Sequence, residues 1–136
     1  MRAALAALAL LGACATPAPP AVSPQPIHLS GTEWMRVDDS NAAPHNPTIV
    51  FEDARASGFA GCNRWFAGVT QNGEALRFGA IGTTRMACTA EPAAAAERSF
   101  LTALAATRYA HYDQDALVLL DSEQHQLARF ESTLPH

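Results

Sequence analysis

A single stretch of helical periodicity, residues 89–110, interrupts a chain otherwise made of short alternating segments. Its larger apolar residues recur three and four positions apart, which places them on one face of a helix: Ala93, Ala96, Phe100, Leu101 and Leu104. Thr89 is a residue type that caps helices, and Pro92 is tolerated only in a first turn, so we expect the helix to begin there. We expect it to end near Thr107.

The segments on either side of this helix predict β-strands. Residues 32–37, 48–53, 116–121 and 127–131 are short, mostly apolar and bounded by turn residues, and Asn72-Gly73 is a strong hairpin signal. Antiparallel pairing suits such turns, so we expect a mainly β (α+β) fold of about seven or eight strands. The sheet should be small, curled or barrel-like, with the helix packed against it.

Large side chains must build the core, because alanine accounts for much of the apolar content. The aromatic candidates for the core are Phe51, Phe59, Trp65, Phe66, Phe78, Phe100 and Phe130. A barrel of this size has room inside mainly for its own side chains.

The N-terminus has the pattern of an export signal. Arg2 precedes the apolar residues 3–11, a run far shorter than the roughly 20 residues that a membrane-spanning helix needs. The sequence Leu-Gly-Ala-Cys that ends at Cys14 resembles the bacterial lipobox. The resemblance implies cleavage before Cys14, a diacylglycerol on its sulfur and acylation of the new N-terminus. We therefore predict a lipoprotein signal peptide over residues 1–13 and attachment to a membrane through palmitate-type chains.

The residues after Cys14 predict where the protein is anchored and how far it reaches. Ala15 stands where an aspartate would signal retention, which by resemblance to Gram-negative sorting implies the outer membrane, with the periplasmic face expected. Residues 16–26 are rich in proline and favour an extended polyproline helix. At about 3.1 Å per residue, such a tether could separate the lipid from the domain by roughly 30 Å. We therefore expect residues 14–26 to be a lipidated tether and residues 27–136 to be one domain.

The charge of the chain excludes one class of partner. The net charge is −4, and all nine basic residues are arginines scattered singly along the sequence. No basic stripe is present that could follow a phosphate backbone, so we expect no nucleic-acid partner.

Three roles compete for Cys62. A metal site would need clustered ligands, but the sequence has no CxxC and its histidines are dispersed. A nucleophile would need a base, and no histidine is close in sequence. Acylation of Cys14 would leave Cys62 and Cys88 as an even pair in an oxidising compartment. A disulfide between them, worth about 3–4 kcal/mol on the chain-entropy account, is the role that we favour. We expect no metal and no cofactor.

Several motifs around this pair resemble the META domain, the family of the heat-inducible HslJ-type envelope proteins. They are "GCNRWFAG" at 61–68, "TTRMAC" at 83–88, Glu97 with Phe100, and "LVLLD…LARF" in the C-terminal part. The resemblance covers about residues 29–131 and implies an antiparallel β structure wrapped against one helix. It also implies a link to heat stress or antibiotic tolerance, without a settled enzymatic activity. Residues 122–126, "SEQHQ", stand where the family usually places a glycine-bearing turn.

The residues near the cysteine pair are the candidates for a functional surface. Two arginines beside a rigid bridge could form a patch for an anion or a partner protein, together with their neighbours: Asn63, Arg64, Thr84, Arg85 and Met86. The structural alternative is that Asn63 caps a turn, the arginines pair with carboxylates and Met86 packs in the core.

These observations predict a non-enzymatic envelope lipoprotein that supports envelope integrity, or stress and antibiotic tolerance, by binding another envelope protein. No G-x-S-x-G or S-x-x-K motif is present, so we expect no enzyme. An alternative is a periplasmic carrier of a small ligand with a lipocalin-like cavity, and a third is an enzyme that uses Cys62. An apolar internal pocket would favour the carrier; a filled interior with an exposed apolar or arginine patch would favour protein binding.

Overall fold

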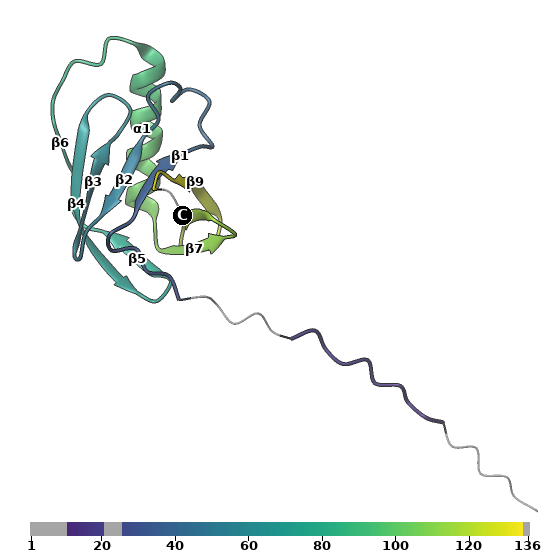
Figure 1. Ribbon diagram of the computed structural model, residues 1–136. Coiled ribbons are helices and arrows are strands. Elements are labelled where there is room, and N and C mark those ends of the chain that lie inside the picture. Colours follow the sequence, from purple (N-terminus) through teal and green to yellow (C-terminus); the bar gives the residue numbers. More distant parts are fainter. Residues whose placement is uncertain (1–10, 21–25, 135–136) are drawn as a thin grey trace, which may run out of the picture.

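The computed structural model describes residues 11–20 and 26–134, and Figure 1 shows the arrangement of the elements. In chain order the elements are β1 (Glu33–Arg36), β2 (Thr48–Phe51), β3 (Arg55–Phe59), β4 (Arg64–Asn72), β5 (Ala75–Phe78), β6 (Gly82–Thr83), α1 (Glu91–Ala106), β7 (Tyr109–Asp113), β8 (Ala116–Leu120) and β9 (Gln126–Ser132).

The strands form one antiparallel sheet that closes on itself. Their order is β3-β2-β1-β9-β8-β7-β5-β4-β6, and an additional pairing of β3 with β4 joins the two sides of the sheet. β6 lies outside this ring, on the edge of β4 that β5 occupies further along. The predicted mainly β, antiparallel, barrel-like fold with one helix is therefore confirmed. The predicted strand count was low because β6 has only two residues and carries no alternation that sequence reasoning could detect.

β1 and β2 each bury alternate residues. Trp34 and Arg36 are buried, whereas Met35 between them is 37% exposed, and Ile49 and Phe51 are buried on the neighbouring strand. Arg36 is satisfied inside by an ion pair with Asp38 (2.8 Å) and a hydrogen bond to Ser99 on α1 (3.0 Å). A buried guanidinium with these partners ties the first strand to the helix.

Aromatic side chains and leucines fill the interior of the ring. Phe100 of α1 lies edge-on to Trp65 of β4 (5.5 Å between centroids) and to Phe130 of β9 (6.3 Å). Edge-to-face contacts of this kind stabilise beyond the area that they bury. The largest fully buried apolar side chains are Trp65, Phe51, Phe100, Phe130, Leu29, Ile49, Leu76, Leu104, Leu117 and Leu119. Of the predicted core aromatics, Phe59 and Phe78 are half-buried, and Phe66 is wrong because it is 49% exposed.

The helix begins one residue later than predicted. Ala90, not Thr89, is the N-cap, and no side chain bonds to the helix start. Pro92 does stand in the first turn, and the helix ends before Thr107, whose hydroxyl donates to the carbonyl of Ala103 (2.8 Å). The fully buried helical residues are Ala96, Phe100, Ala103 and Leu104; the predicted Ala93 and Leu101 are half-buried.

The hairpin signal in β4 and β5 is displaced by one residue. Asn72 pairs with Ala75, so the two-residue turn is Gly73-Glu74 and not Asn72-Gly73. Gly73 has φ 59°, which a first turn residue of the II′ type requires. The predicted terminal hairpin of β8 and β9 forms, but its connection is residues 121–125 and not the predicted 122–126.

The predicted signal peptide and tether fall largely on residues 1–10 and 21–25, which lie outside the described residues. Residues 11–20 are exposed and form neither helix nor strand. Burial begins at Ile27, whose carbonyl accepts a hydrogen bond from the side chain of Gln71 (2.9 Å). None of the helices in residues 11–20 and 26–134 is long and apolar enough to cross a membrane.

Candidate interaction surface around the disulfide

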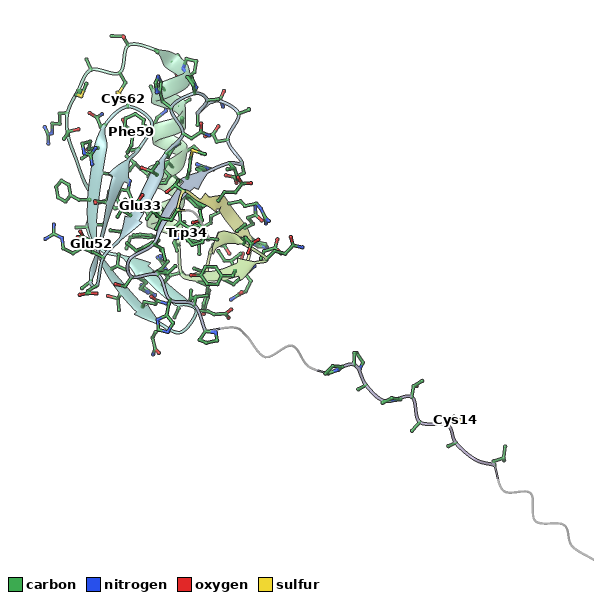
Figure 2. The ribbon with its side chains drawn as sticks, viewed as in Figure 1. Cys14, Glu33, Trp34, Glu52, Phe59 and Cys62 are labelled. Atoms are coloured by element: carbon green, nitrogen blue, oxygen red, sulfur yellow. A yellow bond between two sulfur atoms is a disulfide. The ribbon has the colours of Figure 1, made fainter. Side chains whose placement is uncertain are left out.

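Cys62 and Cys88 form the predicted disulfide, with their Cα atoms 5.9 Å apart. The bond joins the loop after β3 to the segment that leads into α1. Figure 2 shows Cys62 at one end of the domain, and Figure 1 shows the chain ahead of β1 reaching the domain at the other end. Cys14, the predicted lipidation site, is exposed and unpaired among the described cysteines.

Asn63 connects three segments next to the disulfide. Its backbone N–H donates to Glu97 Oε1 (2.8 Å) and its side-chain Nδ2 to Glu97 Oε2 (3.1 Å). Its Oδ1 accepts from the backbone N–H of Met86 (2.6 Å) and from the hydroxyl of Thr84 (3.2 Å). Since Asn63 is only 6% exposed, these bonds satisfy it in the interior. Asn63 therefore holds the surface together from the interior, whereas Thr84, which bonds to it, remains exposed.

Gly61 allows the loop to approach the helix. It has φ 119°, and a Cβ at this position would lie 3.1 Å from the backbone nitrogen of Glu97 and 3.2 Å from the carbonyl oxygen of Ala93. Both the conformation and the close approach disfavour any larger residue. The Gly-Cys-Asn motif thus allows the loop after β3 to pack closely against α1.

The remaining predicted patch residues are exposed. Arg64, Arg85 and Met86 face solvent, and Met86 is 67% exposed, so the structural alternative that packs Met86 in the core is wrong. Neither arginine has a carboxylate within ion-pair distance among the described residues. Phe66, two positions after Arg64 on β4, shares its outward face. Strand alternation from the buried Trp65 is the signal that could have placed Phe66 on this surface.

Two groups of potential metal ligands occur in the described part of the chain. In the first, Cys62 and Cys88 accompany Glu97, but their sulfurs are bonded to each other and are no longer thiolates. The second consists of Asp121, Glu123 and His125 in the β8–β9 turn, and it is partly exposed. Hydrogen bonds within the turn account for this second group, so neither group indicates a metal site.

Two titratable side chains outside this surface have shifted pKa values. The backbone N–H groups of His125 (2.9 Å) and Glu123 (2.8 Å) donate to Asp121, and the bond from His125 is the main cause that lowers the pKa of Asp121. Burial raises the pKa of Tyr112, whose hydroxyl donates to the carbonyl of His28 (2.9 Å). Asp121 thus stabilises the β8–β9 turn, and Tyr112 holds the segment before β1 at His28.

The hollows of the described structure lie at its surface. One of about 560 Å³ opens beside the β2–β3 turn and is lined by Ser30, Gly31, Phe51, Glu52, Asp53, Ala54 and Arg55. The interior of the ring, where a carrier would hold its ligand, contains the aromatic and leucine side chains described above. This arrangement favours binding at the surface over the carrier hypothesis.

The sequence matches the META domain over residues 27–133. The chain belongs to the META domain family. The "GCN" and "TTRMAC" motifs that carried the resemblance are the two segments that the disulfide and Asn63 join. No curated protein matches the chain.

Two solved structures share this META fold. One, a protein from Burkholderia xenovorans determined by NMR, is 25% identical with a TM-score of 0.63, and the match covers 89% of this chain and 99% of that one. A second NMR structure is 16% identical with a TM-score of 0.58, covering 76% of this chain and 90% of the other. These two neighbours support the fold.

Proposed function

We propose that this META domain protein is a non-enzymatic, HslJ-type lipoprotein of the cell envelope, anchored to the outer membrane through Cys14. It acts by binding another envelope protein and thereby supports envelope integrity or tolerance of stress. The observation that carries the proposal is the contrast between a filled interior and an exposed surface of Arg64, Phe66, Arg85 and Met86. Exposed large apolar residues next to unpaired arginines are typical of protein interfaces.

The position of this surface supports the same proposal. The chain ahead of β1, which the expected tether precedes, and the segment between β6 and α1 lie at opposite ends of the domain (Figure 1). A domain held by its N-terminal tether can therefore present the surface away from the lipid.

Site-specific photocrosslinking in a Gram-negative host tests the proposal. We place a benzophenone amino acid at Met86 and, as a control, at Gln114 in the β7–β8 turn. The proposal predicts a discrete adduct with an envelope protein from position 86 only. It also predicts that the protein fractionates with membranes. Cys14→Ala should reduce both the fraction of protein on membranes and the yield of the adduct from position 86. Equal adducts from both positions, or an unanchored wild-type protein, would contradict it.

A further inference from the structure

Among the described residues, no strand pairs with the outer edge of β6 or of the residues that follow it. β6 is the last strand in the sheet order, and within residues 11–20 and 26–134 its one partner strand is β4. Beyond it the chain continues past the start of β4 to the loop before it, because Thr84 donates its N–H to the carbonyl of Arg64 (3.0 Å) and Met86 donates its N–H to Asn63 Oδ1 (2.6 Å). Figure 1 shows this segment along the outside of the sheet, with no element beyond it.

Alternate backbone groups of this segment point away from the domain. Successive N–H groups of an extended chain face opposite sides, and those of Thr84 and Met86 face inward. The N–H groups of Thr83, Arg85 and Ala87 therefore face outward, and these three residues are exposed. None of the three N–H groups donates a hydrogen bond within the described residues. This spacing is what an added β-strand needs.

An aromatic ring reaches the same edge. Phe66 pairs with Gly82 across β4 and β6. A Cβ at Gly82 would lie 2.3 Å from Phe66 Cζ. The ring therefore lies across the glycine, and any larger residue at position 82 would displace it from this position. Phe66 remains 49% exposed there, available to a side chain of an added strand.

The charge at the edge differs from that of the whole protein. The chain has a net charge of −4, yet Arg64 and Arg85 flank the edge without a carboxylate within ion-pair distance among residues 11–20 and 26–134. Exposed arginines without such a carboxylate can form charge-assisted hydrogen bonds with the carboxylates of a partner molecule. The edge is therefore complementary to an acidic segment.

We infer that residues 82–87 bind an extended segment of a partner protein, rich in acidic residues alternating with apolar ones, by β-strand addition. The inference rests on the proposed function and specifies its partner. Main-chain bonds to Thr83, Arg85 and Ala87 supply the alignment. Contacts with Phe66 and the arginines supply the preference for sequence.

Peptide selection followed by hydrogen exchange tests the inference. A random twelve-residue peptide library is selected on the full chain, held by its anchor in detergent micelles. The inference predicts enrichment of peptides that alternate Asp or Glu with apolar residues. A synthetic selected peptide should slow exchange of the N–H groups of Thr83, Arg85 and Ala87. N-methylation of alternate peptide amides should weaken binding by about tenfold or more, because it removes the strand pairing.

Variants separate charge from backbone pairing. Arg85→Pro removes an outward N–H that has no partner in the fold, and the double variant Arg64→Glu, Arg85→Glu reverses the local charge. Each should lower peptide affinity about tenfold or more, whereas Arg77→Glu on β5, the matched charge control, should leave it unchanged. Circular dichroism confirms that each variant is folded.

Three outcomes would overturn the inference. The first is a selected set without acidic residues. The second is protection of N–H groups elsewhere, which would leave the proposed function standing with a different surface. In the third, anionic phospholipid vesicles protect Thr83, Arg85 and Ala87 and the peptides do not. Absence of any crosslinked envelope partner would instead count against the proposed function itself.

Discussion

Asn63 and Glu97 are joined by two hydrogen bonds, from the backbone N–H (2.8 Å) and from Nδ2 (3.1 Å) of Asn63 to the two carboxylate oxygens. The pair links the loop after β3 to the middle of α1, next to the disulfide. Because the acceptor is a carboxylate, both hydrogen bonds are charge-assisted. Together they are stronger than two hydrogen bonds between neutral groups. It fixes the position of the "TTRMAC" segment through the remaining bonds of Asn63.

Removing either partner should destabilise the domain strongly. Asn63→Ala or Glu97→Ala leaves buried polar groups unpaired, and we expect each to lower the free energy of unfolding by about 2–3 kcal/mol. The double variant should show a coupling of about 1–2 kcal/mol, measured by urea denaturation. Glu91→Ala, at an exposed ion pair of the same helix, serves as the control and should cost under about 0.5 kcal/mol. Additive effects of Asn63→Ala and Glu97→Ala would contradict a direct interaction between these two residues.

Replacing either cysteine of the disulfide should lower the free energy of unfolding by the same amount. The bond closes a loop with a sequence separation of 26 residues. On the chain-entropy account, Cys62→Ser and Cys88→Ser should each lower the free energy of unfolding by about 3–4 kcal/mol. The double variant should be no less stable than either single one. A Cys62→Ser variant that keeps its stability but loses a catalytic turnover would support the nucleophile hypothesis instead.

Glycine should stabilise the turn between β8 and β9. Gln124 has φ 68°, a conformation that costs most L-residues about 1–2 kcal/mol. Gln124→Gly should raise the free energy of unfolding by about 0.5 kcal/mol after the entropy of the unfolded chain is counted. Glu123→Gly, one residue earlier at a negative φ, should lower it by a similar amount. A loss of stability at both positions would contradict the assigned turn conformation.

Asp121 should contribute to stability in a defined range of pH. Hydrogen bonds from the backbone N–H groups of His125 and Glu123 lower its pKa below the ordinary 3.8. The folded state therefore binds its proton less tightly than the unfolded state. The contribution is present above the unfolded pKa and is lost as pH falls through the folded one. Asp121→Asn should flatten the stability profile below about pH 5, as measured by urea midpoints. Asp115→Asn in the β7–β8 turn is the charge-matched control.

Much of the fold could be predicted because its signals are local. The face of α1 that contains Ala96, Phe100 and Leu104 follows from spacing alone, and alternation in residues 32–37 and 48–53 predicts the strands β1 and β2. Thr89 is a better cap than Ala90, yet the helix begins after Ala90, two residues after the disulfide-bonded Cys88. Tertiary contacts decide such boundaries.

The surface was harder to predict than the fold. Sequence proximity to the cysteines predicted a patch that includes Asn63, Arg64 and Arg85. It could not show that Asn63 is buried, or that both arginines are exposed with no ion pair among the described residues. The unpaired edge after β6 follows from the closure of the sheet between β3 and β4, a long-range pairing with no local signature.

The most direct test of an anchored, disulfide-bonded binding module is the intact mass of the protein extracted from membranes. Thiols are alkylated before and after reduction. The account predicts a chain that begins at Cys14 and carries lipid, with no alkylation of Cys62 or Cys88 until the sample is reduced. A chain that retains residues 1–13 without lipid, or one that is alkylated at Cys62 and Cys88 before reduction, would contradict it.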